Sequence, residues 1–280
     1  MVIETPQDQY VEVGQIKTRF WALGNEGTAV ILIHGIGGSI ENWMLNINAL
    51  AWHHRVYAVD LAGFGRSDKP LIQFTYSYGA QFVNDFMEVK RINHASLIGN
   101  SMGSGVVLKF TIQFPDKVER LVLANSAGLG KELSYILRLA TLPLIGEFFT
   151  RPSRKGTARS LKQAVYDPTF LTEELVESFY QLSTLPKAQE YLLSTLRRIS
   201  NLRGQHADDI HAIVDNLTTI TAPTLIVWGQ QDRILPVAHA HIAWERIPNA
   251  ELYILDHCGH QPQLERPEEF NNFVLEFLAR

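Results

Sequence analysis

Three residues whose side chains can combine in nucleophilic catalysis each follow a short apolar run. Ser101 stands in "GNSMG", Asp232 follows "TLIVWG" in "GQQDRILP", and His260 follows "AELYILD" in "HCGHQPQ". A serine hydroxyl is a weak nucleophile at neutral pH, so it needs a base within hydrogen-bond reach and a group that orients that base. We expect Ser101 to be the nucleophile, His260 the base and Asp232 the orienting acid.

The serine lies between two glycines, Gly99 and Gly103, at a predicted junction between a strand and a helix. A tight turn crowds the backbone there, and glycine removes the clash because it has no Cβ. Such a turn can hold a serine in a sparsely populated conformation with its hydroxyl outward. The pentapeptide alone fits a flexible turn equally well, so the interpretation depends on the other residues.

A glycine-rich loop, "HGIGGS", follows the apolar run "TAVILI". Backbone N–H groups in such a loop can point at a developing oxyanion, and we expect the donors to be the amides of Ile36 and Met102. Met102 also begins a predicted helix, whose dipole favours negative charge at that end. A phosphate-binding loop is disfavoured because no G-K-[ST] follows. We expect His34 to shape the loop by local packing or bonding.

Other carboxylates compete with Asp232 for the role of the acid. Asp60 ends "VYAVD", but the following "DLAGFGRSD" is typical of a structural turn in which Asp60 bonds loop amides. Some enzymes carry the acid after the strand that follows the nucleophile helix. Here that position reads "LANSAG", without a carboxylate, which favours Asp232. Asp208 and Asp209 remain as fallbacks.

Most of the other histidines lie in helical or polar connecting segments. His239 and His241 form a His-x-His pair in a predicted helix, where side chains two residues apart diverge, so we expect no metal site. The histidines expected at the surface are His53, His54, His94, His206 and His211.

The elements that must position these residues are short apolar runs alternating with helical patterns. A hairpin is predicted first, from "YVEV" and "QIKTRFWAL". The strand-like runs then include 28–35 and 54–63, and helices are expected at 77–91, 102–114, 236–246 and 267–279. This alternation predicts an α/β fold with a mostly parallel, doubly wound sheet.

The alternation stops after "LANSAGLG", and residues 131–215 show a helical pattern instead. This segment forms either a separate bundle or a cap over the carboxyl edge of the sheet, where ligands bind. We expect the cap, 131–215, on a core of residues 1–130 and 216–280. Two sets of cap residues have two possible roles each. The aromatic set either lines the pocket or packs within the cap, and the basic set either binds a carboxylate or forms a solvated face. They are the aromatic residues Phe148, Phe149, Tyr166 and Phe170, and the carboxylate-binding candidates Arg197, Arg198 and Arg203.

The bulk composition excludes several classes of protein. The chain has 280 residues, 46% of them hydrophobic, and a net charge of −4, which gives no electrostatic case for binding nucleic acid. No apolar run approaches the ~18 residues of a membrane span. The single cysteine, Cys258, allows no internal disulfide and is expected to be buried. We expect a cytoplasmic protein that uses no cofactor or metal and acts on a small-molecule carbonyl substrate. The sequence does not indicate the oligomeric state.

Together these segments resemble the α/β-hydrolase fold superfamily. The resemblance covers nearly the whole chain and rests on "HGIGGS", "DLAGFGRSDKP", "GNSMG", "LIVWGQQDRILP" and "CGHQPQLERPEEF". It implies the same roles for Ser101, Asp232 and His260, the same oxyanion donors, and a helical cap. Epoxide hydrolases and haloalkane dehalogenases of this superfamily use an aspartate nucleophile, so Ser101 argues against both.

Two serine-dependent subgroups are close to this sequence. "GNSMG" and "CGH" resemble the hydrolases that cleave carbon–carbon bonds in ring-fission dienoates. Those enzymes usually have a proline in the oxyanion loop and a tryptophan after the histidine, whereas this chain has "HGIGGSIENW" and Gln261. We therefore expect a carboxylesterase for small or medium esters, with hydrolysis of 2-hydroxy-6-oxodienoates as the alternative. A catalytically idle receptor or scaffold is disfavoured by the intact triad.

Overall fold

The computed structural model describes residues 6–70 and 72–280. Its main sheet is eight-stranded, in the order β1-β2-β4-β3-β5-β6-β9-β10. The strands are β1 Gln9–Val13, β2 Ile16–Leu23, β3 Ala29–Ile33, β4 Arg55–Val59, β5 Ala95–Asn100, β6 Val118–Ala124, β9 Thr224–Gly229 and β10 Ala250–Leu255. β2 pairs antiparallel with β1 and β4, and the other pairs are parallel. The predicted α/β fold with a mostly parallel sheet is confirmed.

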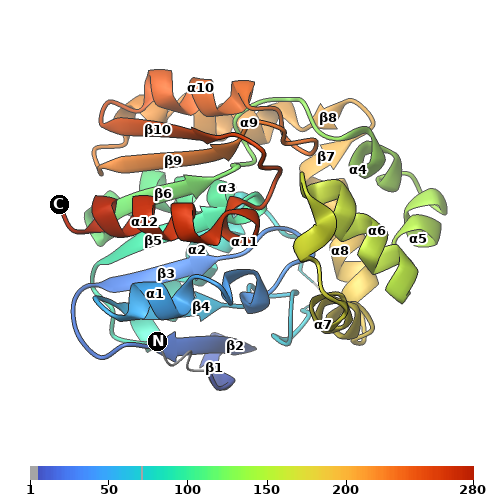
Figure 1. Cartoon of the computed structure of the whole chain (residues 1–280), viewed down its shortest axis with the longest axis horizontal. Coiled ribbons are helices and arrows are strands. Elements are labelled where there is room, and N and C mark those ends of the chain that lie inside the picture. Colours follow the sequence, from blue (N-terminus) through green and yellow to red (C-terminus); the bar gives the residue numbers. More distant parts are fainter. Residues whose placement is uncertain (1–5, 71) are drawn as a thin grey trace.

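The central strands are mostly apolar because helices cover both faces of the sheet (Figure 1). Every residue of β3, β5 and β9 is buried. Side chains such as Ile31 and Leu97 pack with Phe86 on one face, and side chains such as Leu32 and Ile98 pack with Phe270 on the other. The helices of the first face are α2 Tyr76–Val89, α3 Met102–Gln113, α9 Ala207–Val214 and α10 Ala238–Arg246, and those of the second include α1 Ile47–Ala51 and α12 Pro267–Leu278.

The sequence also specifies where individual helices begin. The hydroxyl of Thr75 accepts a hydrogen bond from Tyr78 N and so caps α2. Ser134, Ser153 and Thr172 cap α4 Tyr135–Ala140, α6 Arg154–Ala164 and α7 Glu173–Ser183 in the same way. The short elements are η1 Ile40–Trp43, η2 Pro115–Lys117, η3 Pro168–Phe170, η4 Leu217–Thr219 and α11 Pro262–Glu265.

A group of helices between β6 and β9 lies at the carboxyl edge of the sheet, beyond the ends of its strands (Figure 1). They are α4 Tyr135–Ala140, α5 Ile145–Phe149, α6 Arg154–Ala164, α7 Glu173–Ser183 and α8 Ala188–Ile199. α9 follows them but packs against α3, where Ile213 is fully buried in the core. The helices at the sheet edge therefore end before α9 returns the chain to the sheet.

The prediction that residues 131–215 are helical is wrong at residues 200–205. Ser200–Asn201 and Gly204–Gln205 pair as the antiparallel strands β7 and β8. Gly204 adopts a φ of 114°, which ends any helix there. Gln205 then accepts from Gly128 N and donates to the carbonyl of Gly130, so this hairpin is fixed to the loop after β6.

Within residues 6–70 and 72–280, no helix combines the length and the apolar character that crossing a membrane requires. Cys258 is a free thiol and is completely buried, as expected. Burial raises the pKa of this thiol, so it stays protonated and has the character of a small packed side chain.

Candidate active site

Ser101 lies in a tight turn between the end of β5 and the start of α3. Its φ of 56° and ψ of −121° are unusual for a residue with a side chain. A Cβ on Gly99 would come within 2.5 Å of the Gly103 backbone, and one on Gly103 within 2.2 Å of the Ile33 carbonyl oxygen. The two glycines of "GNSMG" are therefore required by close backbone packing, and a flexible turn does not describe this segment.

The loop after β3 lies directly against this turn. A Cβ on Gly35 would stand only 3.0 Å from the Cβ of Ser101. Ile36 and Met102, the two predicted oxyanion donors, line the same cavity as Ser101. Met102 is the first residue of α3, where the N–H groups have no partner within the helix. The structure thus places both residues beside the serine, and their role as oxyanion donors stays a prediction.

His34 fixes the conformation of this loop. Its Nε2 accepts a hydrogen bond from Leu61 N at 3.0 Å, so its Nδ1 donates to the Gly35 carbonyl at 2.7 Å. Burial lowers the pKa of His34 to about 4, which keeps the ring neutral and preserves its acceptor nitrogen at neutral pH. The expectation that His34 shapes the loop is confirmed.

The Asp60 side chain is hydrogen-bonded to the backbone at the end of the glycine-rich loop. Its carboxylate accepts from Ile40 N at 2.7 Å and from Arg66 N at 2.8 Å, with Arg19 Nη1 at 3.4 Å. Burial raises the pKa of Asp60 to about 7 despite the opposing Arg19 charge. The expectation that Asp60 bonds loop amides is confirmed.

His260 and Asp232 come together although they follow different strands. His260 Nδ1 lies 2.8 Å from Asp232 Oδ2, and the Asp232 side chain is fully buried. The carboxylate also accepts from Ile234 N at 2.7 Å, Leu235 N at 3.1 Å and Asn125 Nδ2 at 2.6 Å. Because the carboxylate binds Nδ1–H, the other imidazole nitrogen is left free to accept a proton.

The loop that carries His260 is anchored on both sides. His260 N donates to the Ala164 carbonyl at the end of α6. The Glu265 carboxylate accepts from Gly259 N, Gln261 N and Tyr166 N at 2.9, 3.0 and 2.7 Å. Glu265 therefore joins the His260 loop to the segment after α6.

A second pair of side chains connects the glycine-rich loop to the His260 loop. Asn42 Nδ2 donates to Gln261 Oε1 at 2.9 Å, and Asn42 Oδ1 accepts from Ser39 N at 3.0 Å. The backbone donor fixes the orientation of the Asn42 amide, which in turn fixes that of Gln261. Asn42 and Gln261 both line the cavity around Ser101, so the Gln261 NH₂ is a candidate donor to a substrate oxygen.

The cavity that contains Ser101 and His260 has a volume of about 290 Å³. Apolar residues from the helices at the sheet edge cover it, among them Phe149, Leu161, Phe179, Leu192 and Leu196. Of the aromatic residues considered from sequence, only Phe149 lines this cavity in the described chain; Phe148 is 77% exposed.

The cap arginines considered for carboxylate binding do not reach this cavity. Arg197 pairs with Glu147 and Arg198 with Asp209, while Arg203 lies in a separate surface hollow with Arg197. The pairing with Arg198 also removes Asp209 as a substitute for Asp232. Among the described lining residues, Arg151 is the one arginine or lysine.

Several residues of the site were missed from sequence. Asn125, Asn42 and Glu265 are ordinary polar residues there, and no spacing marks their partners. The surface prediction for His54 is wrong: the residue is buried, and Thr28 Oγ1 lies 3.1 Å from its Nδ1. His239 is also buried, 2.9 Å from a Glu132 oxygen, and the described residues contain no cluster of three or more metal-ligating side chains.

Comparison with known proteins gives a consistent family. The family described as alpha/beta hydrolase fold matches residues 28–267. The 2-hydroxy-6-oxo-6-(2'-aminophenyl)hexa-2,4-dienoic acid hydrolase of Metapseudomonas resinovorans is 33% identical over 98% of this chain and 91% of its own. A 2-hydroxy-6-oxononadienedioate/2-hydroxy-6-oxononatrienedioate hydrolase of Burkholderia vietnamiensis is 29% identical, with coverage of 99% and 97%. A solved meta-cleavage product hydrolase of Pseudomonas fluorescens aligns with a TM-score of 0.83, 27% identity and 97% coverage of both chains.

Proposed function

Because this chain belongs to the α/β-hydrolase fold family, we propose that it is a serine hydrolase that cleaves carbon–carbon bonds in 2-hydroxy-6-oxodienoates. The observation that carries the substrate class is the similarity to two hydrolases of such dienoates over at least 98% of this chain. The ester specificity expected from sequence is therefore the less supported of the two alternatives.

The proposed roles follow from the arrangement around the cavity. Ser101 attacks the ketone carbonyl while His260 takes its proton, and Asp232 holds the imidazole in the required tautomer. The amides of Ile36 and Met102 stabilise the oxyanion. The helices α4 to α8, within the predicted cap, cover the cavity and shape it for the substrate.

Carbon–carbon cleavage needs an additional proton transfer. The enol of the substrate must first ketonise, which moves the enol proton to carbon and creates an electron sink for the leaving carbanion. The bond beside the ketone then breaks, the acyl group stays on Ser101, and the leaving dienolate takes the proton from His260 and departs as the dienol. His260 then removes a proton from the water that attacks the acyl-enzyme and passes it to the Ser101 oxygen as the acid product leaves.

Ester hydrolysis remains the second candidate, because one observation favours it. Arg151 is the one lysine or arginine among the described residues that line the Ser101 cavity, and it is exposed. An ester needs no cation beside its reacting carbonyl, whereas a dienoate carries a carboxylate that must be desolvated or paired.

The test is a direct comparison of kcat/KM for a 2-hydroxy-6-oxo-6-phenylhexa-2,4-dienoate and for p-nitrophenyl butyrate. We expect the dienoate to be preferred by about 100-fold, which corresponds to about 2.7 kcal/mol in transition-state binding. The Ser101→Ala protein is the control for non-enzymatic decay of each substrate. Preference for the ester by a similar factor would establish the second candidate instead.

A further inference from the structure

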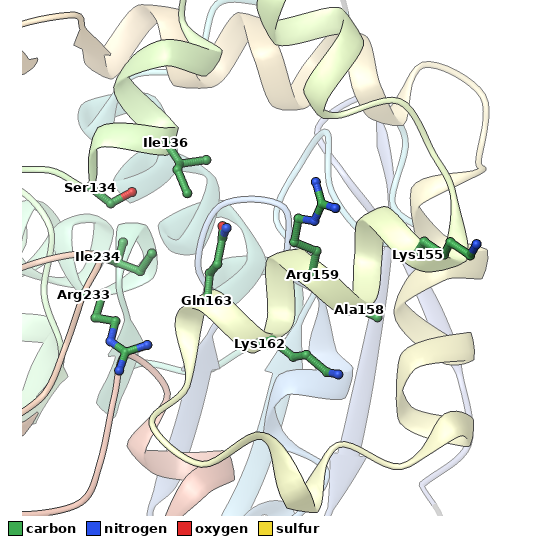
Figure 2. Close-up of a pocket in the computed structure, with 9 residues that line it drawn as sticks. All are labelled: Ser134, Ile136, Lys155, Ala158, Arg159, Lys162, Gln163, Arg233 and Ile234. Carbon is green, nitrogen blue, oxygen red and sulfur yellow. The ribbon is translucent and has the colours of Figure 1, made fainter.

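A second hollow opens beside the Ser101 cavity, between α6 and the loop that follows Asp232. Its volume is about 550 Å³, and its lining includes Lys155, Arg159, Lys162 and Arg233. Figure 2 shows the three cationic residues of α6 along one helix, with Arg233 on the neighbouring loop. We name this hollow the basic groove.

The sequence of α6 places these cations together. Lys155, Arg159 and Lys162 are spaced i, i+4 and i+7, so they share one face of the helix. Arg154 pairs with Glu177 of α7. The helix thus uses one cation to join its neighbour and directs three others to the groove.

Within the described residues, no ion pair involves Lys155, Arg159, Lys162 or Arg233, and the groove lining contains no aspartate or glutamate. Asp232 is adjacent to Arg233 in sequence, but its buried carboxylate accepts from His260, Asn125 and backbone amides. Although the chain has a net charge of −4, this cluster of unpaired cations gives the groove a positive potential, which favours an anion there.

The basic groove adjoins the Ser101 cavity. Both hollows are lined by Ser134, Ile136, Gln163 and Ile234. The end of α6 is also fixed to the His260 loop, because His260 N donates to the Ala164 carbonyl. Three of the four cations therefore lie on a helix that is hydrogen-bonded to the backbone of the proposed base.

We propose that the basic groove binds the carboxylate of an anionic substrate whose reacting carbonyl lies at Ser101. The inference rests on the proposed function in taking Ser101 as the nucleophile, and it locates the carboxylate of the dienoate. In a dienoate the carboxylate lies at the opposite end of the conjugated chain from the ketone. A substrate that spans both hollows would place its ketone beside Ser101 and its leaving-group carboxylate among the cations.

The magnitude expected is moderate because the cations are exposed to solvent. A single exposed ion pair contributes about 0.2–1 kcal/mol, but several cations within a Debye length of about 8 Å act together on one carboxylate. Reversing two charges should therefore weaken binding of the anion by about tenfold, or about 1.4 kcal/mol.

The test compares Arg159→Glu/Lys162→Glu with a control pair, Arg203→Glu/Arg246→Glu, which changes the net charge equally at exposed positions outside both hollows. The substrates are 4-carboxyphenyl butyrate and its neutral analogue, 4-(methoxycarbonyl)phenyl butyrate. We expect the groove variant to lose about tenfold in kcat/KM for the carboxylate and less than about twofold for the methyl ester. The control should lose neither, and about 0.5 M NaCl should reduce the wild-type preference for the anion.

Equal losses for the two esters, or no loss for either, would overturn the basic groove. A binding measurement keeps the test independent of turnover. Calorimetry with Ser101→Ala protein should show that the groove substitutions weaken the carboxylate ester selectively, and equal affinities with and without them would also overturn the proposal. Failure of dienoate cleavage by the wild type would instead refute the proposed function, while the ester pair would still report on the groove.

Discussion

Asn125 Nδ2 donates a 2.6 Å hydrogen bond to Oδ2 of Asp232, the same oxygen that receives His260 Nδ1. Asn125 also donates to the Gly259 carbonyl and accepts from Gly229 N, so it joins the ends of β6, β9 and β10. It occupies the position after β6 where some enzymes of this architecture carry the acid. Here the position serves as a support for an acid that comes from the next strand in the sheet.

Removing the Asn125 amide should reduce turnover while leaving the triad residues in place. Asn125 has a φ of 46°, which glycine adopts without strain and alanine does not. Asn125→Gly therefore removes only the side-chain amide, whereas Asn125→Ala removes the amide and also strains the backbone. Loss of a hydrogen bond to a charged group costs about 1.5–3 kcal/mol, so we expect kcat to fall by roughly tenfold or more in both variants. Steady-state kinetics and urea unfolding separate the two effects, since only the alanine variant should lose further stability. Wild-type kcat in the glycine variant would show that Asp232 needs no such support.

Substitutions of the proposed triad should act on chemistry and leave the fold intact. Ser101→Ala removes one oxygen beside a cavity, and we expect activity below about a thousandth of wild type. Asp232→Asn should lower kcat by roughly 10⁴-fold, because the amide stabilises the wrong tautomer of His260. Circular dichroism and single-turnover kinetics on purified protein check both. A few per cent residual activity in Ser101→Ala would remove the serine from its role.

Glu265 should affect both stability and turnover, because its carboxylate holds the His260 loop against the segment after α6. Glu265→Ala leaves three backbone N–H groups without this acceptor, and we expect a loss of about 1–3 kcal/mol in unfolding free energy together with a lower kcat. Glu265→Gln is the matched variant, since its amide oxygen can retain the position that accepts from Tyr166 N and Gly259 N. Equal behaviour of the two variants would mean that charge alone, rather than these bonds, is what matters at this position.

Acidification should destabilise the protein through His34. Its folded pKa of about 4 lies below the ordinary value of 6.5, so the unfolded chain takes up the proton first as the pH falls. Stability is fully present above 6.5 and decreases toward 4, by at most about 3 kcal/mol. Asp60 contributes a slope of opposite sign, because its folded pKa is raised to about 7.

The His34 contribution can be isolated by comparison with His34→Gln, which keeps a donor and an acceptor but does not titrate. Urea unfolding between pH 4 and 6.5 should show a steeper loss of stability on acidification in the wild type than in this variant. Because both proteins retain Asp60, its contribution cancels in the difference. Parallel stability curves would contradict a depressed His34 pKa.

The order of the apolar runs and helical patterns was enough to predict the sheet and the edge at which the candidate residues gather. Short apolar runs that alternate with helical patterns are typical of central strands in a covered sheet, and loops after parallel strands share its carboxyl edge. Ser101, Asp232 and His260 each follow such a run, so their meeting was predictable without knowing any contact. Gly99 meets a local backbone requirement, since a Cβ there would collide with Gly103, whereas Gly103 is required by the Ile33 carbonyl from a distant strand.

The side chains that support this arrangement could be identified only from contacts between residues far apart in the chain. Asn125 and Asp232 are 107 positions apart, and Asn42 and Gln261 are 219 positions apart, so no local pattern relates them. The arginines Arg197 and Arg198 looked suitable for a carboxylate, but Glu147 and Asp209 neutralise them from other helices. The cations of α6 repeat at helical spacing, yet the sequence does not state which face of α6 turns toward the site. That choice depends on how α6 packs against α7 and on its bond to the His260 loop, because the free energy of packing is shared among elements distant in the chain.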